Sequence, residues 1–241
     1  AVIAMTQTRD GYLWLGTLNG LVRFDGIRFT VFDEGNTPEL GSSRIVHLFE
    51  DSRSNLWVGT ETAGIKLIKN GRISDVGLGR GSSEGRLLGA CEDSGGAVWL
   101  YTADGQLCRD RDGRVDIWKH EAQRFSSCRA VFAEKSLLWV GVNWGLFSMG
   151  PTAGLDPQEL PWQQFMPIGM LDFVLAARGG GHWRLADGRV QRWQTNQLQR
   201  DFGPYPWKST AHVSAACEDR EGNLVVGTLN ENDGVFWFGA D

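Results

Sequence analysis

Basic side chains recur at one position of a repeated sequence. This position is thirteen residues before the central residue of a Trp-containing run. It holds Arg44, Arg86 and His212 in three copies and Met170 in another, and Arg129 is slightly displaced from it. Guanidinium and imidazole groups donate hydrogen bonds to carboxylates and to sugar hydroxyls. A ring of such donors predicts a binding site for an oxygen-rich ligand. The alternative is that the arginines pair with loop acids such as Glu84 or Glu39.

Aromatic residues outside the repeated run add a second kind of contact. Trp144 lies in VNWG, Trp162 in ELPWQQF, and Tyr205 with Trp207 in GPYPWKS. Aromatic rings in loops stack on sugar faces or on the surface of a partner protein. They also serve as anchors that fix a loop over the edge of the core. Both interpretations remain open from the sequence.

A carboxylate recurs six residues before the central residue in three copies, as Asp51, Asp93 and Asp219. Paired carboxylates can act as general acid and base, but an aspartate in a tight turn accepts backbone N–H bonds. We therefore expect these acids to be structural. The chain shows no nucleophile elbow, because its G-x-S-x-G string, Gly81 to Gly85, lies in the Gly-rich stretch GLGRGSSEG without a strand-to-helix setting. The four histidines lack metal-ligand spacing. We predict no catalytic residue, no metal site and no cofactor.

The elements that must position these residues follow from the repeat itself. The central residues are Trp14, Trp57, Trp99, Trp139 and Trp183, with Val225 in the last copy, which gives a period of about 42 residues. Each copy contains four short runs of alternating apolar and polar residues, separated by turns rich in Gly and Asp. This pattern is typical of antiparallel strands, and helix is nearly absent.

Four strands in each repeat, arranged radially, make a β-propeller blade. We expect an all-β, single-domain propeller over residues 1–241, with blades at 1–43, 44–85, 86–128, 129–169 and 170–211 and an incomplete blade at 212–241. The tryptophans should fill the space between neighbouring blades. The glycine two residues later in four of the copies, at Gly16, Gly59, Gly141 and Gly227, should lie where the next blade approaches.

The stretches QTRDGYLWLGTLNGLVRFDG and EDSRSNLWVGTETAGI resemble the two-component regulator propeller repeat. The resemblance is strong in the first, second and sixth copies and loose in the fourth and fifth. It implies an extracytoplasmic sensor domain, periplasmic or extracellular, attached to a membrane-spanning signalling protein such as a hybrid histidine kinase. Several members sense carbohydrate fragments. The family usually has seven blades, so six copies indicate either an excerpt of a longer receptor or a ring closed with six.

Composition excludes other classes. The net charge is -5 and no run of Lys or Arg interrupts it, so a nucleic-acid partner is not expected. No apolar run approaches the roughly 18 residues that cross a bilayer. The four cysteines, Cys91, Cys108, Cys128 and Cys217, lack metal spacing and are expected to be buried thiols. A disulfide between Cys108 and Cys128 is left open.

The sequence thus favours a non-catalytic propeller that binds a small molecule such as an oligosaccharide at the mouth of its central channel and signals through neighbouring domains. A protein-interaction scaffold and a carbohydrate-active lyase or hydrolase are the alternatives. If the chain lacks a blade, its first and last sheets would expose apolar faces, and a homodimer would be expected.

Overall fold

The computed structural model describes residues 1–78, 85–119, 128–135, 137–150, 162–194, 196–208, 211–229 and 234–240. These residues fall into two compact units. The first unit holds strands β1 to β12 and a short 3-10 helix, Pro38–Leu40, and the second unit holds strands β13 to β23.

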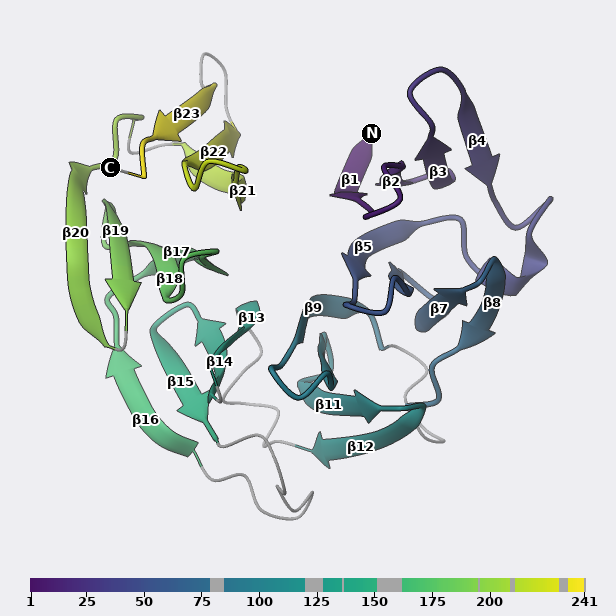
Figure 1. The fold of residues 1–241 in the computed structure, drawn as a ribbon, viewed down its shortest axis with the longest axis horizontal. Coiled ribbons are helices and arrows are strands. Elements are labelled where there is room, and N and C mark those ends of the chain that lie inside the picture. The colour runs from purple at the N-terminus through teal and green to yellow at the C-terminus, as the bar shows by residue number, and fades with distance from the viewer. Residues whose placement is uncertain are drawn as a thin grey trace. The chain divides into compact units, whose positions relative to one another are not determined.

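The first unit consists of three antiparallel sheets of four strands (Figure 1). Blade 1 contains β1 (Val2–Gln7), β2 (Leu13–Thr17), β3 (Gly20–Phe24) and β4 (Phe29–Phe32). Blade 2 contains β5 (Ile45–Glu50), β6 (Leu56–Thr60), β7 (Ile65–Lys69) and β8 (Arg72–Asp75). Blade 3 contains β9 (Leu87–Glu92), β10 (Val98–Thr102), β11 (Gln106–Arg111) and β12 (Arg114–Lys119). The strands of each blade pair in chain order, as a meander.

The second unit has the same organisation. Blade 4 contains β13 (Cys128–Glu134), β14 (Leu137–Val142), β15 (Gly145–Met149) and β16 (Trp162–Pro167). Blade 5 contains β17 (Leu171–Ala176), β18 (His182–Ala186), β19 (Arg189–Gln194) and β20 (Gln197–Pro204). Blade 6 has three strands in the part that the structure describes, β21 (His212–Glu218), β22 (Leu224–Leu229) and β23 (Val235–Phe238). The prediction of an all-β propeller built of four-stranded antiparallel blades is confirmed.

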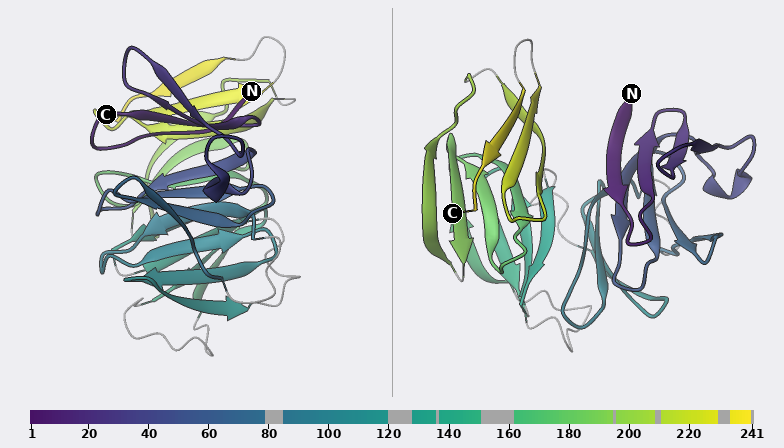
Figure 2. Two further views of the ribbon diagram at one scale, coloured as in Figure 1. Left: turned by 90° about the vertical axis from the view of Figure 1, so that its right-hand side faces the viewer. Right: turned by 45° about the horizontal axis from the view of Figure 1, so that its top comes forward.

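The first strands of consecutive blades lie side by side within each unit: β5 lies between β1 and β9, and β17 lies between β13 and β21 (Figure 1, with further views in Figure 2). The connection between the second and third strands therefore emerges at one end of every blade. The turns between the first and second strands, and between the third and fourth, emerge at the other end. These two ends are called the loop end and the turn end below.

Within each unit, tryptophans of the repeat fill the space between neighbouring sheets: Trp57 packs against blade 3, Trp139 against blade 5 and Trp183 against blade 6. Trp57, Trp99, Trp139 and Trp183 are at most 2% exposed, whereas Trp14 in blade 1 is half-buried. Burying an indole removes a large apolar area from water, and truncating such a ring costs about 3–5 kcal/mol. The blades are thus held together mainly by these rings and the aliphatic residues around them.

In blades 2 and 4 the glycine two residues after the buried tryptophan marks a close approach of the next blade. A Cβ on Gly59 would lie 2.7 Å from Cβ of Leu87, the first residue of β9, and a Cβ on Gly141 would lie 2.9 Å from Leu171 at the start of β17. A side chain at either position would push the neighbouring blade away. Glycine is therefore required by packing rather than by backbone angle.

A β-bulge recurs near the start of the first strand in each of the six blades, for example between Ile45 and His47 and between Cys128 and Ala130. The bulged residue of blade 2 is Val46, and that of blade 4 is Arg129. Arg129 is therefore two positions beyond the place that corresponds to Arg44. Counting back from the tryptophan could not show this offset, because the turn between β13 and β14 is shorter. Trp139 pairs with Phe132, seven residues earlier, whereas Trp57 pairs with Phe49, eight residues earlier.

Candidate ligand-binding face

The residues predicted to ring the channel mouth lie at the loop end, where the chain enters the first strand of a blade. The backbone carbonyl of Arg44 accepts a hydrogen bond from the amide of Glu61 at 2.9 Å, and that of Arg86 accepts one from Ala103 at 2.8 Å. Met170 is held in the same way by Asp187 at 2.9 Å. In each of these blades, the residue that precedes the first strand is thus hydrogen-bonded to the residue four places after the central tryptophan.

This pairing gives the two arginines different surroundings. Arg44 faces Glu61 and forms an ion pair with it. Pairing with an acid was the alternative to ligand binding, although the sequence predicted Glu84 and Glu39 as the partners. Arg86 faces Ala103 instead, and no acid in the described part of the chain pairs with its exposed guanidinium. The Arg44–Glu61 pair is solvent-exposed and contributes little to stability. Arg86 is therefore the guanidinium that is available to a ligand.

A hollow of about 350 Å³ adjoins Arg86 within the first unit. Its lining residues are Ile3, Val46, His47, Glu61, Arg86, Leu87 and Leu88. Ile3, Val46 and Leu88 come from the bulged or neighbouring positions of three successive first strands, so the repeat itself shapes the apolar wall. The hollow combines an unpaired cation, an acceptor and apolar surface, which is the composition of small-molecule sites.

Burial lowers the pKa of His47, and a hydrogen bond with the backbone of Leu48 opposes this only in part. The imidazole is therefore neutral at pH 7, with one donor and one acceptor nitrogen. The hollow thus carries two charged side chains, Arg86 and Glu61, of opposite sign.

The second unit presents different side chains at its loop end. Trp144 is 43% exposed and packs edge-on against Phe147, with ring centroids 5.4 Å apart. His212 is exposed at the start of β21. Arg129 lies in β13, whereas Trp162 begins β16 opposite Met149 and therefore lies at the turn end. Only the backbone of these last two residues is described, so their role in a site remains a prediction.

Trp207 lies in the core of the second unit. It is 8% exposed and packs against Phe236 and Phe238 of β23, while Tyr205 stacks on its other side at 4.4 Å. The hydroxyl of Tyr205 donates to Asp172 at 2.7 Å. This arrangement favours the loop-anchor interpretation of the GPYPWKS stretch, since the indole is covered by its neighbours.

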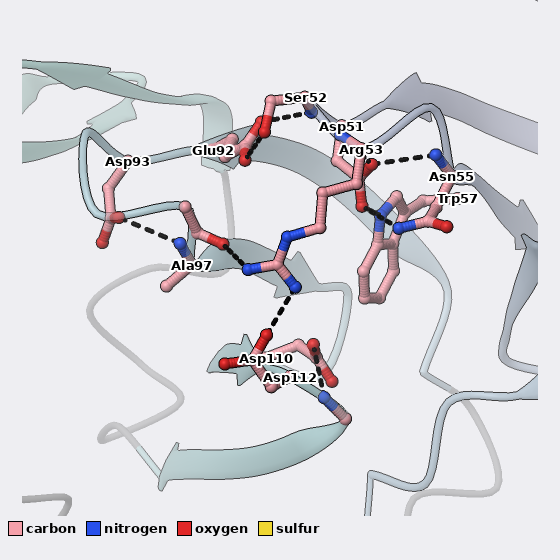
Figure 3. A network of polar contacts seen from close by, with 12 residues as sticks. Asp51, Ser52, Arg53, Asn55, Trp57, Glu92, Asp93, Ala97, Asp110 and Asp112 are labelled. Atoms are coloured by element: carbon pink, nitrogen blue, oxygen red, sulfur yellow. Dashed lines mark hydrogen bonds and ion pairs between the residues drawn. The ribbon is translucent and has the colours of Figure 1, made fainter.

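The recurrent aspartates lie at the turn end, away from the loops. Oδ1 of Asp51 accepts the amides of Arg53 and Asn55, and its Oδ2 accepts the indole N–H of Trp57 at 3.0 Å (Figure 3). Asp93 holds Trp99 in the same way at 2.8 Å. These carboxylates have their hydrogen bonds satisfied inside the turn, which leaves them unsuited to proton transfer.

In blade 6, where Val225 replaces the tryptophan, a different indole donates the hydrogen bond to the aspartate. Trp237 lies opposite Val225 on β23 and donates to Asp219 at 3.3 Å. Hydrogen bonds, the strongest of them from the side chain of Asn223, hold the pKa of Asp219 below its usual value.

The glutamate before each of these aspartates has a role that sequence reasoning missed. Glu50 accepts the amide of Arg9 in the turn of blade 1, and Glu92 accepts both the amide and the hydroxyl of Ser52 in the turn of blade 2 (Figure 3). Glu218 binds the amide of Arg178 at 2.6 Å. The dipeptide Glu-Asp thus joins each of these blades to the one before it, and its recurrence was the available signal.

Within the described residues no three His, Cys, Asp or Glu side chains gather as a metal site, and no helix has the length and hydropathy to cross a bilayer. Cys108 is a buried free thiol, and burial raises its pKa to about 12. The alternative of a disulfide at Cys108 is therefore not realised.

Comparison with protein families identifies one of the repeats. The family described as Two component regulator propeller matches residues 39–62, which run from the 3-10 helix through β5 and β6. The second repeat is a two-component regulator propeller repeat. This two-component regulator propeller match covers the Glu50–Asp51 dipeptide and Trp57, and it confirms the resemblance seen in the sequence. No curated protein matched the chain.

Solved propellers share the fold at low identity. Virginiamycin B lyase from Staphylococcus aureus matches with 15% identity and a TM-score of 0.70, over 100% of this chain and 84% of the lyase. The extracellular domain of a protein described as a hybrid two component system from B. thetaiotaomicron matches with 18% identity and a TM-score of 0.69. That match covers 100% of this chain and 32% of the sensor.

A third solved structure is PorZ, a surface component of the type-IX secretion system of Porphyromonas gingivalis, with 13% identity and a TM-score of 0.70. It covers 100% of this chain and 39% of PorZ. This chain spans well under half the length of the sensor and of PorZ. At such identities the likeness establishes the propeller fold, which lyases, sensors and secretion components share.

Proposed function

We propose that this chain is a non-catalytic, ligand-binding propeller that belongs to the sensor of a two-component signalling protein. Its ligand is an oxygen-rich small molecule such as an oligosaccharide, bound at the loop end of the first unit. The observation that carries the proposal is the exposed guanidinium of Arg86, which has no acid partner in the described residues and adjoins the hollow of about 350 Å³.

The chemistry of the hollow fits such a ligand. Arg86 offers several N–H donors in one plane to a carboxylate or to adjacent hydroxyls, and the carboxylate of Glu61 accepts hydrogen bonds from hydroxyl groups. Ile3 and Leu88 supply apolar surface for the C–H face of a sugar ring. Arg44 contributes by holding Glu61 in position through their ion pair.

The repeat at residues 39–62 supports a signalling context, as do the solved propellers described as extracellular domains of two component systems. We therefore place the chain outside the cytoplasm, periplasmic or extracellular, with neighbouring signalling domains of a longer chain as its partners. A homodimer through the exposed faces of blades 1 and 6 remains part of this proposal.

Isothermal titration calorimetry with neutral and acidic oligosaccharides tests the proposal. Arg86→Gln should weaken binding of the best ligand by about tenfold or more, since it removes a charge-assisted hydrogen bond. Arg72→Gln, an exposed arginine on β8, is the matched control and should leave the affinity unchanged.

The outcomes separate the three classes of function. Equal affinity in Arg86→Gln removes Arg86 from the site, and failure of every oligosaccharide to bind contradicts the sensor proposal. Release of a shorter or unsaturated product from a bound oligosaccharide supports the lyase or hydrolase alternative. A co-purifying protein that protects Trp144 from oxidation supports a scaffold.

A further inference from the structure

A second cavity lies between blades 1 and 2, and the proposed function does not use it. Its volume is about 540 Å³, within the range of small-molecule pockets. Residues from the turn end line it, namely Thr8, Asp10, Tyr12 and Ser54, together with Asn70 and Gly71. The cavity therefore belongs to the turn end of the first unit, whereas the hollow beside Arg86 belongs to the loop end.

One wall of the cavity is aromatic and carries a cation. Trp14 and Phe32 stack with centroids 5.8 Å apart, and the guanidinium of Arg23 lies over the ring of Tyr12 at 4.5 Å. Arg23 also lies 5.8 Å from Trp14 and 6.0 Å from Phe32. Leu56, together with Ile68 and Ile73, supplies the apolar part of the lining. The rings fix the plane of the guanidinium, since a cation is attracted to aromatic faces.

Blade 3 contains the same arrangement in completed form. Arg109 lies opposite Trp99, packs over Trp99 and Trp118, and these two rings stack at 5.2 Å. Its neighbour on the fourth strand is Asp116, which accepts from the guanidinium at 2.8 Å. Both side chains are almost fully buried. A carboxylate is therefore the group that this arginine position binds when its surroundings are dry.

In blade 1 the corresponding neighbour is Thr30 instead of an aspartate. No carboxylate in the described part of the chain forms an ion pair with Arg23. Asp25, two residues further on, uses Oδ1 for the amides of Ile27 and Arg28 in its own turn. The half-buried guanidinium of Arg23 thus faces a cavity at the place where blade 3 supplies a carboxylate.

The two acids in the lining are committed to other groups. Asp10 accepts the hydroxyl of Thr8 at 2.5 Å and the amide of Tyr12 at 3.3 Å. Both oxygens of Glu50 accept the amide of Arg9 at 3.1 Å. The negative charges of Asp10 and Glu50 disfavour a ligand that carries several negative groups. Binding of a single carboxylate next to Arg23 remains favourable. No acceptor in the described residues contacts the indole N–H of Trp14, in contrast to the indoles bound by aspartate in blades 2 and 3.

We propose that the cavity between blades 1 and 2 binds a small aromatic monocarboxylate, whose carboxylate pairs with Arg23 and whose ring packs against Trp14, Phe32 and the aliphatic residues. The carboxylate occupies the place that Asp116 fills in blade 3. The bidentate geometry of a guanidinium with a carboxylate gives the site its selectivity for an acid over an amide.

Benzoate is the probe and benzamide its neutral counterpart, with binding followed by ligand-observed NMR and by tryptophan fluorescence. Benzoate should bind the unmodified chain about tenfold or more tightly than benzamide. Arg23→Gln should abolish this preference. Thr30→Asp, which copies blade 3, should weaken benzoate by about tenfold or more because the new carboxylate competes for Arg23, while Thr30→Asn should stay within about twofold of the unmodified chain.

Thr30 is exposed, so circular dichroism should show Thr30→Asp folded. Absence of benzoate binding in the unmodified chain, equal binding of benzamide, or unchanged benzoate binding in Thr30→Asp would each overturn the proposal. Arg86→Gln should leave benzoate binding intact, so the result is independent of the oligosaccharide experiment at the loop end.

Discussion

The indole Nε1 of Trp57 lies 3.0 Å from Oδ2 of Asp51, six residues earlier in the chain. One carboxylate thereby fixes both the turn between two strands and the ring that fills the space between two blades. In blade 4 the strand register places Glu134 at the position of the aspartate, and this side chain contacts His182. In blade 5 the aspartate is replaced by Ala177. In both blades the buried indole N–H groups, those of Trp139 and Trp183, have no hydrogen-bond acceptor among the described residues.

Asp93→Ala should destabilise the protein by about 2–4 kcal/mol, because it leaves the indole of Trp99 and the amides of Gly95 and Ala97 without an acceptor. Urea unfolding measures the change. Glu39→Ala, at an exposed position without a side-chain hydrogen bond in the described structure, should change stability by less than about 0.5 kcal/mol. Similar values for the two variants would contradict the structural role of Asp93.

Ala177→Asp should stabilise the protein by about 1 kcal/mol, since it supplies the missing acceptor for Trp183. The turn is already suitable, because Ala177 and Asp93 make the same pair of backbone hydrogen bonds. The gain should disappear in a Trp183→Phe background, and a double-mutant cycle by thermal unfolding measures the coupling. A gain that persists without the indole would refute this explanation.

Gly59→Ala should cost about 1–3 kcal/mol, because its Cβ would lie 2.7 Å from Leu87 and 3.0 Å from His47. The strain acts between blades 2 and 3, so the substitution should also increase hydrogen exchange in β9. Gly77→Ala is the control, since a Cβ there meets no atom within 4 Å. Normal stability of Gly59→Ala would mean that the blades separate without cost.

His47 should make the protein less stable at mildly acidic pH. Burial lowers the pKa of His47 in the folded state, so the unfolded chain, with an ordinary histidine pKa near ~6.5, binds the proton more readily. The folded state therefore loses stability as the pH falls from about 6.5 towards the lowered pKa. His47→Gln should flatten the stability profile between about pH 7 and pH 5, measured by urea unfolding at each pH. An unchanged slope would assign the acid sensitivity to other groups.

The sequence was sufficient for features that one repeat determines locally. Trp57 and Gly59 occupy places that recur in most copies of the repeat, so their types and spacing carry the information. Arg44 and Arg86 look alike in sequence, and they differ in the structure only because Glu61 stands opposite one and Ala103 opposite the other. That difference depends on how the loop after the second strand contacts the residue that precedes the first strand of the same blade.

Other features depend on contacts between repeats. Trp207 is buried by phenylalanines of the following blade, which no pattern within its own stretch reveals. The contrast between Arg23 with Thr30 and Arg109 with Asp116 could have been found by aligning the fourth strands as carefully as the second. The unpaired state of Arg23, however, follows only from the register of β3 and β4.

The backward reach of Glu50, Glu92 and Glu218 explains how such a chain can lengthen. Each of these three copies carries the glutamate that attaches it to the preceding blade. A tandem duplication of such a copy would therefore carry its own contact to the preceding blade. Blade 5 lacks the glutamate, and its link to blade 4 includes a buried contact between His182 and Glu134 at 3.3 Å instead. The contact between blades 4 and 5 is therefore specific to these two blades, and replacing either of them with another copy of the repeat would remove it.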